Sequence, residues 1–429
     1  MGDYMKKLFE KNLFVRYVGT FFSILLIISI LLILEKSIPN NRVRHNILAS
    51  EEYYQTYFKD LYGNLNTLKN RHTMVDIPGD FYHISILYLE ENKHPVKEFI
   101  EMNKDSQLAS KVVHGKHFID MEVDSDYSRY WHGHLIILKP LLTFFTMGQI
   151  FIIYYIVLII TFLILLWNLL KRDKLLAVIF TLGAVCINLF FASKCDNFFH
   201  VMMITMISSI LIMKMYDTNS KNVDLLFLIN GVLTACFDML SGGTLPVTIP
   251  LFIYVYLHMK DHKKFPFKLF VRYILLWLAG GVFSYVVKWC ILMLHYHGGF
   301  REHVLEPMKV RVGSGDMTRM EMFKDSMQFI PHYLFPYDFY VFDTILIALG
   351  LGSFINLLFD KKNRRYMIYL FILCLIPFIR YYFLAEHSNY HNYFTYRAFW
   401  PVVMFILLSI CLGVIKIINK ISKKVLLQK

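Results

Sequence analysis

Runs of apolar residues, separated by short polar segments, dominate the chain. A helix of about 20 apolar residues crosses a bilayer, and the sequence holds ten segments close to that length. They lie at residues 16–35, 148–170, 175–193, 198–215, 223–240, 244–259, 268–292, 338–359, 365–384 and 395–416. The pattern predicts an all-α polytopic membrane protein with about ten transmembrane helices.

Basic residues cluster in every second connection between these runs. The clusters are Lys6, Lys7 and Lys11, KRDK (171–174), Lys214 with Lys221, KDHKK (260–264), DKKNRR (360–365) and the tail KIINKISKK (416–424). Cytoplasmic loops carry an excess of Lys and Arg. We therefore expect a multi-pass protein of the cell membrane with both termini in the cytoplasm.

The other side of the membrane then receives two long segments, 36–147 and 296–337. The expected organisation is a cytoplasmic N-terminus and first span (1–35), an extracytoplasmic loop (36–147) and a multi-span domain (148–429) that carries the second loop. In the first loop, HPVKEFIEMNK (94–104) has a helical pattern. SRYWHGHLIILKPLLTFF (128–145) has a basic, aromatic head and an apolar body, which predicts an interfacial helix.

Composition supports the membrane class. Of the 429 residues, 56% are hydrophobic, and the mean hydropathy is +0.45. The formal net charge of +13 comes from the basic clusters, so it indicates membrane topology rather than binding to nucleic acid. The six cysteines show no CxxC spacing and predict neither a zinc site nor a disulfide framework. The first apolar run is too long for a cleavable signal peptide.

Ionisable residues near the apolar runs gather on the predicted outer side. Such residues are costly beside hydrocarbon and are usually functional or paired. They are Asp76, Asp80, Arg129, His132, His134, Lys139, Lys194, Asp196, Asp238, Lys288, Arg380, Glu386, His387, His391 and Arg397. The sequence therefore predicts one polar cavity that faces the extracytoplasmic side.

The residue types in this set indicate the chemistry of the cavity. Lys and Arg beside the bilayer suit a phosphate whose lipid tail stays in the membrane. A carboxylate suits a general base that deprotonates an acceptor hydroxyl. Sugar rings would pack on the aromatic residues Trp131, Tyr390, Tyr393, Phe394 and Tyr396. Together they predict sugar transfer from a lipid-phosphate donor.

Five segments carry a resemblance to a known family: VDIPGDFYH (75–83), SRYWHGHLIILKPLL (128–142), FDMLSGGTLPVTIPL (237–251), VVKWC (286–290) and EHSNYHNYFTYR (386–397). With the long first outer loop, they resemble the GT-C superfamily of membrane glycosyltransferases, and within it bacterial polytopic proteins associated with cell-surface polysaccharide synthesis. The resemblance implies a GT-C-like fold, a polyprenyl-phosphate-linked sugar donor, and a glycan or lipid-linked acceptor. It also implies a catalytic carboxylate in the first outer loop.

Asp76 and Asp80 match that catalytic position, and the adjacent pair Glu51 and Glu52 is the alternative. The expected substrate-binding residues are Trp131, His132, Lys194, Asp238, Lys288, Glu386, His387, His391 and Arg397. Four of them have a simpler interpretation beside this one: Asp238 caps a helix, Lys288 snorkels to the interface, Trp131 anchors in the interface, and Lys194 pairs with Asp196.

His387 and His391 have the i,i+4 spacing of a metal motif, but Glu386 does not share their face. No metal ligand set is therefore expected, and no cofactor is certain, although the family pattern leaves room for a divalent cation. Two other functions stay open: a lipid-linked oligosaccharide flippase or transporter, and a non-catalytic subunit of a polysaccharide assembly complex. A transporter predicts internal repeats and polar residues at the midplane, and neither is evident.

Overall fold

A computed structural model describes residues 2–62, 76–313, 317–335 and 340–427. Helices form nearly all of its regular structure. In chain order the elements are α1 (Gly2–Lys36), α2 (Asn40–Leu48), α3 (Glu51–Tyr62), α5 (Ile77–Leu89), α6 (Pro95–Glu101), β1 (Asn103–Lys104), α7 (Leu108–Val113), η1 (Phe118–Asp120), β2 (Ser125–Asp126), α8 (Leu135–Leu142), α9 (Met147–Arg172), α10 (Lys174–Cys186), η2 (Leu189–Lys194), α11 (Asp196–Asp217), α12 (Val223–Phe237), α13 (Leu245–Lys260), α14 (Phe267–Tyr296), η3 (Arg301–Leu305), α15 (Glu306–Val312), α16 (Arg319–Leu334), α17 (Tyr340–Leu358), α18 (Arg364–Phe383), α19 (Ala385–Tyr390), α20 (Asn392–Thr395), η4 (Tyr396–Phe399) and α21 (Trp400–Leu427). The predicted all-α class is confirmed for these residues.

Six helices among the described residues are long and apolar enough to cross a membrane. They are Leu13–Lys36, Met147–Arg172, Asp196–Asp217, Phe267–Tyr296, Arg364–Phe383 and Asn392–Ser422. Four further apolar helices are shorter: Lys174–Cys186, Val223–Phe237, Leu245–Lys260 and Asp343–Leu358. Membrane-spanning character is thus supported, whereas the count of ten spans stays a prediction.

The predicted run 175–193 corresponds to two elements in the structure, and the first of them is one of the short helices. Helix α10 ends at Cys186, and Asn188 follows with a φ of 49°, in the left-handed region that ends helices. The chain then continues as the 3-10 helix η2. A continuous apolar pattern is therefore divided into two elements by a conformation that hydrophobicity does not predict.

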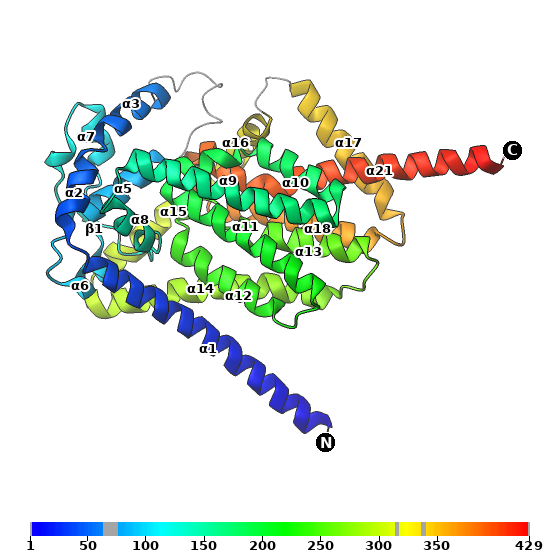
Figure 1. The fold of residues 1–429 in the computed structure, drawn as a ribbon, viewed down its shortest axis with the longest axis horizontal. Helices are drawn as coiled ribbons and strands as arrows, with labels where there is room; N and C mark the ends of the chain where they lie inside the picture. The colour runs from blue at the N-terminus through cyan, green and yellow to red at the C-terminus, as the bar shows by residue number, and fades with distance from the viewer. Residues whose placement is uncertain (1, 63–75, 314–316, 336–339, 428–429) are drawn as a thin grey trace.

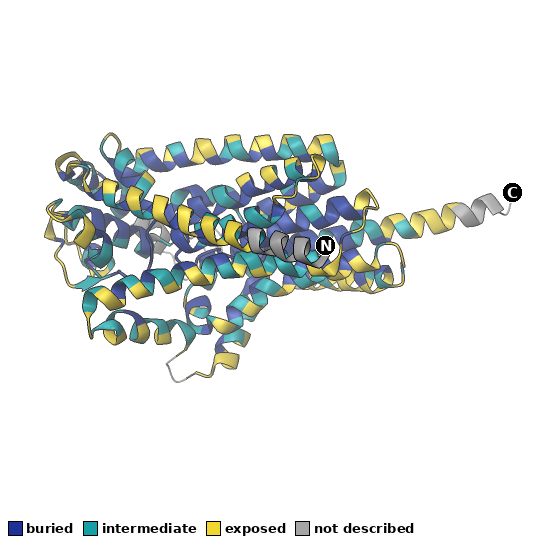
Figure 2. Cartoon of the chain, turned by 90° about the horizontal axis from the view of Figure 1, so that it is seen from below, coloured by how far each residue is buried: buried dark blue, intermediate teal, exposed yellow. Residues whose placement is uncertain are grey.

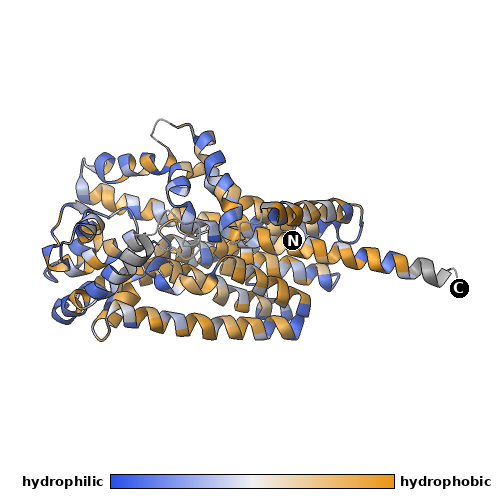
Figure 3. Cartoon of the chain, turned by 90° about the horizontal axis from the view of Figure 1, so that it is seen from above, coloured by the Kyte–Doolittle hydropathy of each residue, from blue (hydrophilic) through white to orange (hydrophobic). Residues whose placement is uncertain are grey.

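The described residues between α1 and α9 form a separate layer, which we call the loop domain (37–62 and 76–146). Its helices gather at one end of the helix bundle, and both chain termini extend toward the other end (Figure 1). Hydrophilic residues concentrate in the loop domain, while hydrophobic residues dominate the long helices (Figure 3). Helix α1 and the end of α21 expose much of their surface (Figure 2). This is the arrangement expected of a membrane bundle with a polar layer on one side.

Glycines allow two bundle helices to pack closely. A Cβ added to Gly231 in α12 would lie 2.0 Å from the Trp277 carbonyl oxygen, and one on Gly280 in α14 would lie 2.5 Å from the Leu228 carbonyl oxygen. Close backbone approach through small residues is the usual way in which membrane helices associate. The α12–α14 pair thus forms a rigid support for the segment that follows α12.

The predicted interfacial helix at 128–145 is shorter than expected. Helix α8 begins only at Leu135, because residues 128–134 form a turn in which His132 has a φ of 56°. The Gly133 N–H donates to the Cys236 carbonyl at 2.7 Å. Trp131 is 1% exposed, and its Nε1 donates to the Ser284 carbonyl at 2.9 Å. This turn therefore enters the bundle, and Trp131 packs inside the protein rather than in the interface.

Candidate functional site

A cavity of about 600 Å³ lies where the loop domain meets the bundle. We call it the outer cavity. Most of its lining comes from the start of α5, from α15 and α16, and from the 386–393 segment, and three residues come from after β2, from α11 and from the connection between α12 and α13. The lining residues are Asp76, Pro78, Gly79, Tyr82, Tyr127, Asn197, Met239, Val310, Arg311, Tyr333, Glu386, His387, Tyr390, His391, Asn392 and Tyr393. The cavity thus brings residues of both predicted outer loops next to the segment before the last long helix.

Asp76 stands at the N-terminus of α5 on one wall of the outer cavity. Its Oδ1 accepts a hydrogen bond from the Gly79 N–H at 3.1 Å, and Pro78 occupies the first turn, where its missing N–H costs nothing. Burial raises the pKa of the Asp76 carboxyl, while the Gly79 N–H and the charge of Arg311 act against that rise. A carboxylate held in this way suits a general base.

Arg311 and two histidines form the facing wall. Arg311 Nη1 lies 3.4 Å from His387 Nδ1, and His387 Nε2 lies 3.0 Å from the Leu240 carbonyl oxygen. The rings of His387 and His391 are 4.7 Å apart. Burial lowers the pKa of His387 well below its ordinary value and that of His391 to about 3, so both imidazoles are neutral. Arg311 is therefore the cation of this wall, and the histidines serve as hydrogen-bonding groups.

Tyrosine rings complete the lining. Tyr82 and Tyr127 meet edge to face with centroids 5.3 Å apart. Lys104 Nζ lies 3.4 Å from the Tyr82 ring centroid and 4.7 Å from that of Tyr127. Burial, followed by the nearby charge of Arg129, lowers the pKa of Lys104 to about 8. Aromatic faces flanked by cations suit both a sugar ring and a phosphate.

Four of the predicted site residues line this cavity: Asp76, Glu386, His387 and His391. Arg397 does not, since it is fully buried, with Nε donating to the Ile187 carbonyl at 3.0 Å. Lys288 is also buried elsewhere, where its Nζ donates to the Phe99 carbonyl at 3.3 Å and lies 4.4 Å from that ring centroid. Both cations bind backbone carbonyls of the protein.

The remaining predicted residues also lie outside the outer cavity. Asp238 accepts from the Ser241 and Gly242 N–H groups at 2.8 and 3.2 Å, so its side chain holds the turn between α12 and α13 rather than capping a helix. Lys194 lines a separate groove of about 670 Å³ beside α9. Glu51 accepts from His117 Nδ1 and from the Phe118 N–H, whereas Glu52 is exposed.

Asp80 and His132 belong to a second buried group behind the cavity wall. We call it the histidine–aspartate cluster: Asp80, His83, His132, His134, Asp196 and His200. Asp80 Oδ1 accepts from the Asp196 N–H at 3.0 Å, and burial raises the pKa of Asp80 well above its ordinary value. Burial also lowers the pKa of His132 and His134 well below the usual range.

Sequence reasoning missed several residues of both groups. Arg311 had a usable signal, because an arginine in a predicted outer loop is contrary to the positive-inside trend. His83 and His200 had a weaker one: they follow Asp80 and Asp196 at i+3 and i+4, which places each pair on one helix face. Only the fold brings the two pairs together.

The fold and site define an all-α protein whose described residues include six helices long and apolar enough to cross a membrane and a cavity of mixed charge. No family model, no curated protein and no solved structure matches the chain.

Proposed function

We propose that the protein is a GT-C-type glycosyltransferase, which moves a sugar from a polyprenyl-phosphate-linked donor to a glycan or lipid-linked acceptor on the extracytoplasmic side. One observation carries the proposal: the outer cavity sets the Asp76 carboxylate and the Arg311 guanidinium among tyrosine rings in about 600 Å³. A general base, a phosphate-binding cation and sugar-stacking surfaces are the three parts that this reaction needs.

In the proposed reaction, Asp76 takes the proton of the acceptor hydroxyl as its oxygen attacks the anomeric carbon. A new glycosidic C–O bond forms, and the bond from the anomeric carbon to the donor phosphate oxygen breaks. The bonding electrons leave with the lipid phosphate, where Arg311 stabilises the charge. His387 orients Arg311, because its own Nε2–H is held by the Leu240 carbonyl. A single displacement inverts the anomeric carbon.

A second hollow supports a lipid-linked donor. An apolar groove of about 490 Å³ runs between α11 and α12, lined mainly by Ile, Leu and Met side chains. Asn197 lines the outer cavity and His200 lines this groove, although they lie within one turn of α11. A donor with its prenyl chain in the groove and its phosphate in the cavity is consistent with that proximity.

Asp76 is the proposed base rather than Asp80. The Asp80 side chain is 1% exposed, one of its oxygens is held by the Asp196 N–H, and it is not among the residues that line the outer cavity. An acceptor hydroxyl in the cavity would therefore meet Asp76.

The test uses the full-length protein in liposomes with a panel of polyprenyl-phosphate monosaccharides, and mass spectrometry to detect transfer. Asp76→Asn should lower the rate by roughly 10²–10⁴-fold, and Arg311→Met should also lower it strongly, with unchanged thermal stability. Glu52→Gln, an exposed carboxylate of the same domain, is the matched control. Full activity of Asp76→Asn, or movement of labelled donor across the membrane without product, would reject the proposal.

A further inference from the structure

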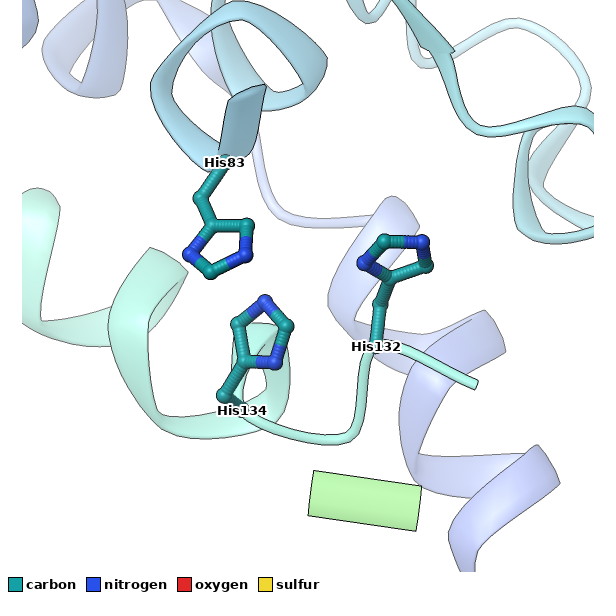
Figure 4. Close-up of side chains that lie close together, drawn as sticks. All are labelled: His83, His132 and His134. Atoms are coloured by element: carbon teal, nitrogen blue, oxygen red, sulfur yellow. The ribbon is translucent and has the colours of Figure 1, made fainter. Parts of the chain in front are cut away.

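Three buried histidine side chains converge behind the outer cavity (Figure 4). His83 comes from α5, and His132 and His134 come from the turn before α8. One ring nitrogen of each lies within 4.8 Å of those of the other two. The ring centroids of His83 and His134 are 3.9 Å apart, and those of His132 and His134 are 5.5 Å apart. All three side chains are 0–1% exposed.

The hydrogen bonds of His132 fix which nitrogen faces the others. Its Nε2 lies 2.8 Å from the Tyr127 carbonyl oxygen, and because a carbonyl only accepts, Nε2 carries the hydrogen. The Nδ1 atom then has a free lone pair, and it is buried without a hydrogen-bond partner among the described residues. One nitrogen bound to a carbonyl and the other left open is the arrangement of a metal-ligating histidine.

His134 and Asp196 provide further open acceptors. Neither nitrogen of His134 has a hydrogen-bond partner in the described part of the chain, although Nε2 lies 3.8 Å from Asp196 Oδ2. Asp196 Oδ1 is held by the Tyr154 hydroxyl at 2.8 Å and lies 3.3 Å from His200 Nε2. Its Oδ2 has no hydrogen bond and lies 3.3 Å from His83 Nδ1. Tyr154 and His200 thus orient a carboxylate whose second oxygen faces two of the histidines.

The cluster buries two carboxyl groups without a lysine or arginine paired to them among the described residues. Asp80 and Asp196 are 1% and 0% exposed. Within the described ranges, no Lys or Arg forms an ion pair with either of them, and Asp196 is paired only with histidines. Buried carboxylates normally pair with a cation or coordinate a metal.

We infer that His83, His132 and His134 form a structural zinc site, with Asp196, whose Oδ2 lies 3.3 Å from His83 Nδ1 and 3.8 Å from His134 Nε2, moving in as the fourth ligand. Three imidazole nitrogens and one carboxylate oxygen match the tetrahedral N/O ligand set of Zn²⁺, whereas Mg²⁺ and Ca²⁺ select oxygen ligands. The site is closed, since all four side chains are 0–1% exposed and none lines the outer cavity. The ion would join α5, the 127–134 turn and the start of α11 behind the cavity wall. This inference does not depend on the proposed transferase activity.

Metal content and cobalt spectroscopy test the site without any assay of transfer. Full-length protein purified in detergent should contain about one zinc ion per chain by elemental mass spectrometry. Protein stripped with a chelator and titrated with Co²⁺ should develop the visible absorption of a tetrahedral Co²⁺ centre, and zinc should displace it. A wild-type protein that binds neither ion would overturn the inference, and this readout needs no variant.

Variants then locate the ligands. His132→Gln and His134→Gln should lower the affinity for Co²⁺ by at least about tenfold. His258→Gln is the matched control, because His258 is also mostly buried and also bonds a backbone carbonyl, that of Tyr254, but lies outside the cluster. Folding is checked by size-exclusion chromatography. Equal cobalt binding by folded His132→Gln, His134→Gln and His258→Gln proteins would overturn the assignment.

Discussion

Two buried clusters of ionisable side chains differ in how their charges are balanced. The first, which we call the four-charge cluster, consists of Glu35, Lys36, Glu90 and Lys139, all of which are 0–6% exposed. Lys36 and Lys139 lie 3.2 and 3.5 Å from Glu35, and each also forms an ion pair with Glu90. Two positive and two negative charges therefore cancel within the cluster.

The histidine–aspartate cluster has no lysine or arginine that balances its carboxylates among the described residues. Its two carboxylates are surrounded by histidines, and oxygen and nitrogen atoms of five of its members remain without hydrogen bonds among the described residues: Asp80, His83, His132, His134 and Asp196. Buried charged side chains occur in both clusters, so burial of charge alone does not indicate a binding site. A cluster in which lysines balance the carboxylates joins elements of the fold, as Lys36 of α1 and Lys139 of α8 do here. Buried carboxyl groups that have only histidines beside them leave a place for the zinc ion proposed above.

The largest expected effect comes from unbalancing the four-charge cluster. Lys139→Met leaves two buried glutamates with one lysine, and breaking a buried pair in this way costs about 3–5 kcal/mol. We expect a large loss of thermal stability in detergent, measured by the unfolding midpoint. The double variant Lys139→Met, Glu90→Gln restores a balanced pair and should recover much of the loss.

Two outcomes would contradict the structural role of that cluster. One is equal stability of the single variant and the wild type, and the other is a double variant no more stable than the single one. Lys93→Met serves as the control, because its partner Glu91 is exposed and the pair lies at the surface. Its unfolding midpoint should match that of the wild type.

A smaller change in stability, which depends on zinc, is expected for Asp196→Asn. Asparagine keeps an acceptor for Tyr154 and His200 but removes the charge. With zinc at 100 times the wild-type Kd, the wild type should gain about 2.7 kcal/mol that the variant lacks. The measurement is the unfolding midpoint of both proteins with and without zinc. A variant stabilised by zinc as much as the wild type would contradict the role of Asp196 as a ligand.

Gly133→Ala tests the turn that carries His132 and His134. An added Cβ would lie 2.8 Å from the Cys236 carbonyl oxygen, which is backbone and cannot move away easily. The expected loss is about 1–3 kcal/mol of folding free energy. Gly298→Ala is the matched control, because no atom lies within 4 Å of a Cβ added there. Gly115→Ala is unsuitable, because the φ of 76° at Gly115 would add strain of its own. Equal loss at both glycines would contradict the close packing of this turn.

The sequence predicted the all-α class, which the described residues confirm, because long hydrophobic runs report directly on the bilayer. The side of the membrane on which the polar residues gather stays a prediction. It also predicted Asp76 and the 386–391 segment as parts of one cavity, and the outer cavity contains them. Such polar positions can be found from the sequence because they interrupt or border an apolar run, which is visible along the chain itself.

Assigning roles within the polar set was harder. Arg397 and Lys288 are of the residue types that bind phosphate, yet both side chains donate to backbone carbonyls. Asp80 and Asp76 are four residues apart, but one faces the cluster and the other the cavity. These differences depend on which carbonyls and rings the fold brings near each side chain, and no local pattern encodes that.

The smallest expected effect is a change in the pH profile of the proposed transfer. Asp76 must be ionised to act as a base, and its pKa is raised by burial, while the Gly79 N–H and the charge of Arg311 oppose the rise. Activity (kcat/KM) should therefore fall on the acid side at a higher pH than an ordinary aspartate would give. Arg311→Gln removes one opposing charge, so the acid limb should move to still higher pH. Lys309→Gln, an exposed neighbour on α15, is the control and should leave the limb in place. An acid limb that is unchanged in Arg311→Gln, or that moves equally in both variants, would show that Asp76 is not the group that titrates.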